Sequence, residues 1–108
     1  MAQNFRRYTA NDVGVTASTL FTADSYDTIV GISLANVTAN QIIVSCYIND
    51  ATNDIYLAKD VPIPAGSALQ LLDGGAKIVV QSGDALKVIS DTASSLDVWV
   101  STVDDISA

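Results

Sequence analysis

The residues of this chain that could do acid–base or ligand chemistry are twelve aspartates and one cysteine; histidine and glutamate are both missing from the sequence. Without histidine, neither a Ser-His nor a Cys-His nucleophilic pair can form, and the common zinc sites are excluded. Paired aspartates can serve as an acid and a base, but most of those present lie beside Gly, Asn or Ser, where an aspartate caps a turn. We therefore predict that the chain is not an enzyme and holds no metal and no cofactor.

Oxygen ligands of the kind that calcium prefers cluster once, in residues 50–54 with the sequence DATND. This segment lacks the glycine and the distal bidentate glutamate of an EF-hand loop, so the favoured interpretation is a hairpin loop. The glycines of residues 73–75 and 82–84 lack the spacing and the following helix of a phosphate-binding loop. None of these segments predicts an active site.

The elements that would position such residues are strands. Aspartate is poor in helix interiors and good in turns, and turn residues recur between short runs of alternating apolar and polar residues. The sequence predicts an all-β fold, an antiparallel and jelly-roll-like β-sandwich of eight or nine short strands. Residues 1–12 are expected to form an N-terminal arm and residues 13–108 a single β-sandwich domain.

Two local features refine this expectation. Gly31 lies in the middle of an apolar run, which predicts a bulge or a close backbone approach. Pro62 and Pro64 predict an irregular link between strands, because proline cannot donate a hydrogen bond to a central ladder.

Charge and composition limit the partners. The net charge of −7 argues against nucleic acid, whose binding depends on Lys and Arg. No apolar run approaches the roughly 18 residues that span a bilayer, and the N-terminus has no apolar segment of the kind found in signal peptides. Cys46 is the only cysteine, which fits a reducing cytoplasm and predicts a small buried hydrophobic residue.

Two aromatic residues are candidates for a subunit interface. The segment 41–48 is apolar on both sides, so we expect it either in the centre of a sheet or covered by another subunit, with Tyr47 on its second side. Trp99 alternates with the apolar residues Val98 and Val100, which places it on the outer face of its strand. Either another subunit covers Trp99 or a loop or the N-terminal arm of the same chain does.

The positive charges of the N-terminus give the remaining candidates. Arg6 and Arg7 precede the first apolar strand of an otherwise acidic protein. An arm that carries them can reach an acidic neighbouring subunit, and the alternative is a frayed, solvated terminus. The predicted interface residues are therefore Arg6, Arg7, Tyr47 and Trp99.

One long stretch resembles a known class of protein. It runs from VPIPAGSALQLL at residues 61–72 through GAKIVV at 75–80 and SGDALKV at 82–88 to ASSLDVWVS at 93–101. It resembles small virion structural proteins of tailed bacteriophages, of the marine and cyanobacterial phage type, and the resemblance covers roughly residues 26–103. It implies a β-sandwich that assembles symmetrically on a particle, and it carries no catalytic or ligand-binding residues.

The function expected from this resemblance is that of a capsid decoration (cement) protein, which stabilises the head by bridging capsid subunits. Its partners would be its own copies, as a homotrimer suggested by capsid symmetry, and other virion proteins such as the major capsid protein. It would reside in the virion after assembly in the host cytoplasm. The alternatives are a tail, neck or fibre-attachment component and a surface carbohydrate-binding module. The last needs a row of exposed aromatics, for which the candidates are Tyr8, Tyr26, Tyr47, Tyr56 and Trp99.

Overall fold

The computed structural model describes residues 5–23, 26–72 and 77–103, which form strands and turns without a helix. Because these residues contain no helix at all, none of them forms one long and apolar enough to cross a membrane. The strands are β1 (Phe5–Val13), β2 (Ser18–Thr22), β3 (Asp27–Asn36), β4 (Ile42–Asn49), β5 (Asp54–Ile63), β6 (Ala68–Leu72), β7 (Ile78–Val80), β8 (Ala85–Ser90) and β9 (Leu96–Val103).

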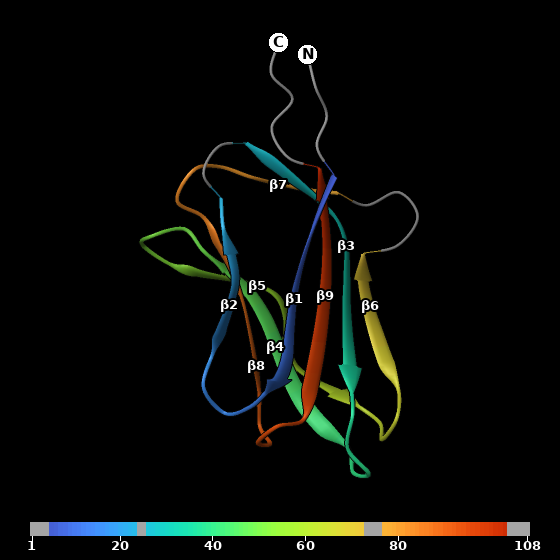
Figure 1. Cartoon of the computed structure of the whole chain (residues 1–108). Coiled ribbons are helices and arrows are strands. Elements are labelled where there is room, and N and C mark those ends of the chain that lie inside the picture. Colours follow the sequence, from blue (N-terminus) through green and yellow to red (C-terminus); the bar gives the residue numbers. More distant parts are fainter. Residues whose placement is uncertain (1–4, 24–25, 73–76, 104–108) are drawn as a thin grey trace.

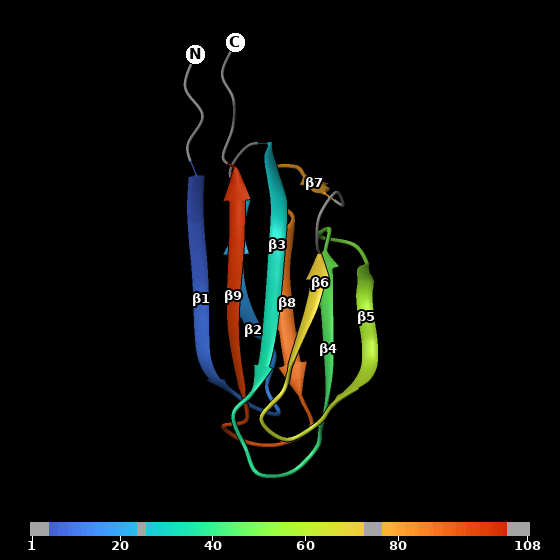
Figure 2. The same ribbon diagram turned by 90° about the vertical axis from the view of Figure 1, so that its right-hand side faces the viewer.

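These strands form two antiparallel sheets that pack face to face (Figures 1 and 2). The first has the order β1-β9-β3-β6, with the short β7 also paired to β3, and the second has the order β2-β8-β4-β5. Each sheet interleaves strands from the two halves of the chain. Apart from β7, this is the eight-stranded, double Greek-key arrangement of a jelly roll. The predicted jelly-roll-like sandwich is confirmed.

The core lies between the two sheets and follows the period-2 alternation of the strands. Alternate residues of β4 and β9 point into it, as the sequence predicted, and the residues between them point outward. The inward set consists of Ile42, Val44, Cys46 and Ile48 from β4 and Leu96, Val98 and Val100 from β9, none of them more than 9% exposed.

Gly31 marks a bulge in β3. The register of β3 against β9 shifts between Ile29 and Gly31, and Gly31 then pairs with Ser101. The predicted bulge is confirmed.

The predicted N-terminal arm is wrong for its described part, because residues 5–12 belong to β1. Phe5 to Ala10 pair in unbroken register with Val103 to Val98 of β9. Tyr8 also stacks on Phe21 of the other sheet, with ring centroids 4.4 Å apart. An edge strand leaves most of its side chains in water, so its sequence reads as polar; residues 1–4 lie outside the described part of the chain.

The predicted irregular link at Pro62 is also wrong. β5 continues through Pro62, which pairs with Ile43, and ends at Ile63. Proline is tolerated there because β5 is an edge strand, where one missing N–H does not interrupt a central ladder. Pro64 follows the end of the strand and leads into the turn before β6.

Candidate binding and interface surfaces

The four predicted interface residues do not form one surface. Tyr47 lies on the outer face of the sheet β2-β8-β4-β5, whereas Arg7 and Trp99 lie on the outer face of the sheet β1-β9-β3-β6. Arg6 precedes Arg7 on β1 and therefore lies on the opposite side of that strand, across from Thr102 of β9. The core separates Tyr47 from Arg7 and Trp99, and Arg6 lies on the other side of β1 from Arg7, so one flat interface cannot contain all four residues.

The outer face around Tyr47, called here the tyrosine face, carries paired aromatic rings. Tyr47 lies directly across from Tyr56 of β5, with ring centroids 5.1 Å apart at an interplanar angle of 40°. The Nζ atom of Lys59 lies 4.9 Å from the centroid of the Tyr56 ring, within the range of a cation–π contact. Partial burial, and then the nearby Asp54 and Tyr56, raise the pKa of Tyr47.

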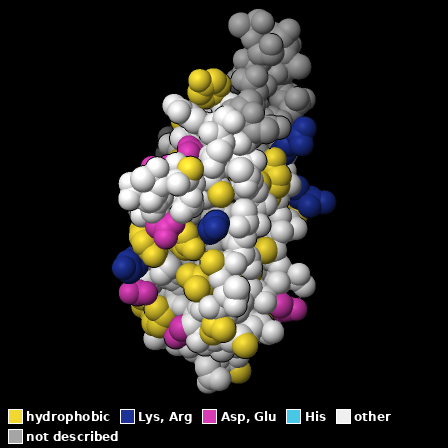
Figure 3. Space-filling view, turned by 90° about the vertical axis from the view of Figure 1, so that its left-hand side faces the viewer, with side chains coloured by type: hydrophobic (Ala, Val, Ile, Leu, Met, Phe, Trp, Pro, Cys, Tyr) yellow, Lys and Arg dark blue, Asp and Glu magenta, His cyan; other side chains and the backbone are white. Residues whose placement is uncertain are grey.

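The tyrosine face is more apolar than an outer face normally is. The outward side chains of β4 and β8 include Ile43, Tyr47 and Ile89, all partly buried. Ser45 between them is 7% exposed, and its Oγ accepts a hydrogen bond from the Asp60 backbone N–H at 2.9 Å. An antiparallel sheet with one face in water usually places polar residues outward. Figure 3 shows hydrophobic side chains gathered around a basic one on this side of the molecule.

The strand β4, which is apolar on both sides, lies in the interior of its sheet. β4 is hydrogen-bonded to β8 on one side and to β5 on the other, so its backbone is fully inside a sheet. Of the two expected alternatives, the structure shows the central strand. Its outward residues Ile43 and Tyr47 still reach the surface, which makes this strand the middle of the tyrosine face.

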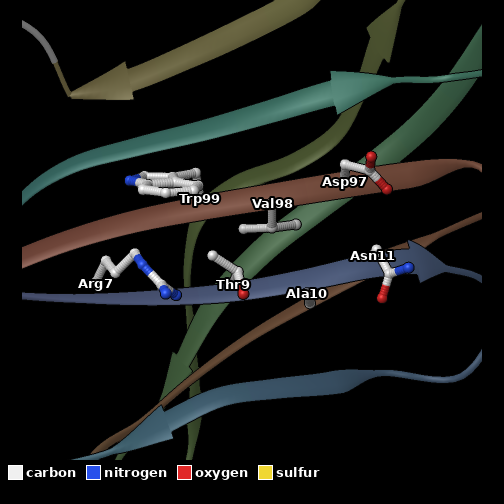
Figure 4. A pocket seen from close by; sticks show the side chains of 7 residues that line it. All are labelled: Arg7, Thr9, Ala10, Asn11, Asp97, Val98 and Trp99. Carbon is white, nitrogen blue, oxygen red and sulfur yellow. The ribbon is translucent and has the colours of Figure 1, made fainter.

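The outer face around Trp99, called here the Trp99 face, has a large ring between two small cross-strand neighbours. Trp99 is 53% exposed, and its cross-strand neighbours are Thr9 on β1 and Ser33 on β3. The Cζ atom of Arg7 lies 5.3 Å from the centroid of the indole ring, a cation–π contact that reaches across from β1. Figure 4 shows the indole and the guanidinium side by side.

Two open hollows share Arg7 and Trp99. The first, of about 400 Å³, presents a guanidinium, a hydroxyl, an amide and a carboxylate (Figure 4). It is lined by Arg7, Thr9, Ala10, Asn11, Asp97, Val98 and Trp99. The second, of about 330 Å³, is more apolar and is lined by Phe5, Arg6, Arg7, Val30, Trp99, Ser101 and Thr102.

The carboxylate of the first hollow is held by the backbone of β1. Asp97 Oδ1 accepts a hydrogen bond from the Asp12 backbone N–H at 3.1 Å. Asp12 has a φ of 55° and lies in the segment between Ala10 and Val13 where the register of β1 shifts. The bulge therefore aims a backbone donor at Asp97 and fixes the polar end of the hollow.

The sequence did not single out Thr9, Asn11 or Asp97. Thr9 and Asn11 belong to the segment predicted as an arm, and their proximity to Asp97 depends on the pairing of β1 with β9. Asp97 and Trp99 alternate with Val98 along the strand, and this alternation did indicate that Asp97 shares the outer face with Trp99. The alternation does not show that β1 is the strand next to β9.

The two aspartate side chains of the loop at residues 50–54, the candidate calcium segment, are hydrogen-bonded within the loop or to its flanking residue Asn49. Asp50 Oδ1 accepts the backbone N–H groups of Asn53 at 2.7 Å and Thr52 at 3.0 Å, and these bonds lower the pKa of Asp50. Asn49 Nδ2 donates to Asp54 Oδ1 at 2.6 Å. Within the described ranges, no three acidic, cysteine or histidine side chains gather as a metal site would require. The segment is a hairpin loop, as predicted.

Cys46 lies in the core with 0% of its surface exposed. Burial raises the pKa of its thiol to about 12, so the reactive thiolate is suppressed at neutral pH. The prediction of a small buried hydrophobic residue is confirmed.

Comparison with known proteins gives one structural likeness. No protein-family model and no curated protein sequence matches this chain. The fold is similar to a solved structure described as "Bacillus endospore appendages form a novel family of disulfide-linked pili", with a TM-score of 0.54 and 13% sequence identity. The match covers 98% of this chain and 88% of that one. At this identity the likeness supports the two-sheet fold alone.

Proposed function

We propose that this chain is a structural subunit of a tailed-phage virion, a decoration protein that seats on the head through its tyrosine face and bridges neighbouring shell subunits. The observation that carries the proposal is the apolar character of that face. Ile43, Tyr47 and Ile89 occupy outward positions where polar residues are expected.

The composition of the tyrosine face suits a protein partner. Tyrosine is enriched among the residues that dominate binding energy, and Tyr47 and Tyr56 lie together, paired between β4 and the edge strand β5. Lys87 lies directly across from Tyr47, and Lys59 lies over the Tyr56 ring, so this face carries two cations on a chain whose net charge is −7. Each contact of this size is modest, but many copies on one particle add up through multivalency.

A second support is the resemblance of residues 26–103 to small virion structural proteins. The stretch includes β3 to β9, and therefore most of both sheets. Jelly rolls are common in viral capsids, although the same fold also serves lectins and enzymes, so the fold by itself does not select a function. The predictions of a homotrimer and of a non-enzymatic role are part of this proposal.

A filament subunit is the rival that the structural likeness favours. The similar structure belongs to disulfide-linked pili. This chain has a single cysteine, Cys46, and it is buried in the core, so the folded subunit cannot use it to form a disulfide with a neighbour. A filament of this protein would therefore need non-covalent contacts between subunits in place of the disulfide links that the description of the similar structure names.

The number of copies per particle separates these proposals. Virions purified from a culture that produces this chain would be analysed by quantitative mass spectrometry against the major capsid protein. A stoichiometry close to that of the shell subunits supports the decoration protein. A handful of copies set by tail symmetry indicates a tail, neck or fibre component, and absence from virions overturns the virion assignment. Light scattering behind a sizing column tests the trimer.

Two matched variants test the docking face. Tyr47→Ala and Tyr56→Ser are expected to lower retention on emptied heads by roughly tenfold or more, because they remove the aromatic contacts of the tyrosine face. Trp99→Ala, on the opposite face, is the control and should be retained like the wild type. Equal retention of all three variants, or a loss confined to Trp99→Ala, would overturn the assignment of the tyrosine face.

A further inference from the structure

We infer that the Trp99 face is a binding site for a neutral saccharide, with one sugar ring in the hollow between Trp99 and Asp97. The inference goes beyond the proposed structural role and does not depend on it, because the hollow is complete within one chain. If the tyrosine face seats on a particle, the Trp99 face lies on the other side of the sandwich and points away from that particle.

The indole ring supplies the apolar half of the site. An exposed aromatic face attracts the C–H groups on the flat side of a pyranose, whose hydroxyls remain at the rim. Trp99 is 53% exposed, and its neighbours Thr9 and Ser33 are too short to cover it. Arg7 braces the ring from β1 at 5.3 Å, which limits its rotamers before any ligand arrives.

The polar groups of the hollow supply the other half. Sugar hydroxyls are both donors and acceptors, so a site that recognises them needs both kinds of partner. Asp97 offers acceptors, Arg7 offers donors, and Asn11 and Thr9 offer both. Because Asp97 lies two residues from Trp99 on the same face of β9, about 6.8 Å along the strand, one ring can touch both.

The charges of the first hollow favour a neutral ligand there. The hollow contains one guanidinium and one carboxylate, from Arg7 and Asp97, whose charges balance. The guanidinium is engaged with the indole, and the chain as a whole carries −7. In the first hollow, a sulfated or sialylated sugar would therefore find no net positive charge to attract it.

The second hollow extends the site along the strands. It shares Arg7 and Trp99 with the first hollow and adds the apolar Phe5 and Val30 together with the guanidinium of Arg6. A ligand longer than one ring would pass over the Trp99–Arg7 pair from the polar hollow into the apolar one. We therefore expect a disaccharide to bind more tightly than the corresponding monosaccharide. An open hollow of this size predicts a Kd on the order of 1 mM for each copy.

The single tryptophan makes the site directly observable. Trp99 is the only tryptophan of the chain, so its fluorescence reports on this site alone. Maltose, cellobiose, lactose and chitobiose would each be titrated into the full-length protein while Trp emission is recorded. Saturation-transfer NMR would show which sugar protons touch the protein. We expect at least one disaccharide to shift the emission saturably and to receive saturation on its ring C–H protons.

Three variants separate the parts of the site. Trp99→Ala should abolish the saturation transfer, and the isosteric Asp97→Asn should weaken binding by about fivefold or more through loss of a charge-assisted hydrogen bond. Tyr56→Ser, on the opposite face, should bind like the wild type. A single cooperative melting transition in each variant would show that it folds.

Several results would overturn the inference. These are no binding of the four disaccharides at concentrations well above the expected Kd, binding that survives Trp99→Ala, or binding confined to sialylated or sulfated glycans in a parallel panel. Loss of self-association or particle docking in Trp99→Ala, without sugar binding by the wild type, would assign the face to a protein partner instead. None of these results changes the copy-number test of the proposed function.

Discussion

The two outer faces of this sandwich each pair an aromatic ring with a cation, yet they present these rings differently. On the tyrosine face, Tyr47 is partly buried beside Tyr56, and apolar residues continue around them. On the Trp99 face, one larger ring stands 53% exposed between Thr9 and Ser33. The exposure of an aromatic residue on a sheet is therefore decided by its cross-strand neighbours as much as by its own side chain.

The difference has consequences for binding. A broad surface of partly buried apolar side chains gives a large area without a hollow, which suits another protein surface. An exposed ring with short cross-strand neighbours, next to polar groups, gives a small area with directional hydrogen bonds, which suits a small polar ligand. Both faces depend on the same core, so variants can affect them together or one at a time.

The largest expected effect is the loss of both faces together in Asn36→Ala. Asn36 is 3% exposed at the end of β3, and its Nδ2 donates to the Ile63 carbonyl of β5 at 2.9 Å and to the Asn40 carbonyl at 2.7 Å. Because the bond to Ile63 joins the two sheets and leaves a buried acceptor when removed, we expect about 3 kcal/mol of lost stability. Urea unfolding followed by Trp99 fluorescence and by far-UV circular dichroism would measure it.

The matched control for this variant is Asn53→Ala in the exposed β4–β5 loop, with an expected change below about 0.5 kcal/mol. Coincident unfolding curves from the two probes would show that both faces belong to one cooperative unit. A loss in Asn36→Ala as small as that of the control would mean that this side chain does not hold the sheets together.

The next effect is alkaline destabilisation that originates in the strand of the tyrosine face. Burial raises the pKa of Cys46 from 9.0 to about 12, so above pH 9 the unfolded chain loses a proton that the folded chain retains. Stability from this group is complete below pH 9 and is lost progressively up to about pH 12. Between pH 8 and pH 10.5 we expect a loss of about 2 kcal/mol in urea unfolding.

Cys46→Ala tests the origin of this slope, because it removes the thiol while leaving the raised pKa of Tyr47 on the same strand. Its stability at pH 8 should be lower than that of the wild type, owing to the cavity, but its decline toward pH 10.5 should be shallower. A decline as steep as that of the wild type would place the alkaline sensitivity elsewhere.

A smaller expected effect is a difference in stability loss between variants of the two faces. Tyr47→Ala removes a partly buried ring and its contact with Tyr56, so we expect a loss of about 1–2 kcal/mol. Trp99→Ala removes a ring that contacts mainly solvent and Arg7, so the loss should stay below about 1 kcal/mol despite the larger side chain. Denaturant midpoints of the two variants would give the order, and the reverse order would show that Trp99 is the better integrated residue.

Much of the fold was accessible from the sequence because strand alternation is a local property. The inward sets of β4 and β9, the bulge at Gly31 and the hairpin loop at residues 50–54 follow from residues that are close in the chain. The same reasoning placed Trp99 on an outer face. These features needed no knowledge of which strand lies beside which.

The predictions that failed depended on strand order. β1 reads as a polar arm because an edge strand exposes most of its side chains, and Pro62 reads as a break unless β5 is known to lie at an edge. The separation of Tyr47 from Trp99 and the approach of Asn11 to Asp97 are likewise properties of the pairing between distant segments. Alternation indicates which side of a strand a residue faces, but it does not reveal the neighbouring strand.

The smallest expected effect concerns the two cations, and it tests the comparison most directly. Arg7 and Lys59 lie 5.3 Å and 4.9 Å from the ring centroids of Trp99 and Tyr56 on surface strands. Each contact should contribute about 0.5–1 kcal/mol at such exposed sites, so Arg7→Ala and Lys59→Ala should have nearly equal effects on unfolding. Their effects on Trp99 emission should differ, because only Arg7 touches the indole. We expect a shifted emission maximum and weaker sugar binding in Arg7→Ala, and neither change in Lys59→Ala. If Arg7→Ala leaves both readouts unchanged, the guanidinium does not brace the ring, and the two faces would differ in side-chain size alone.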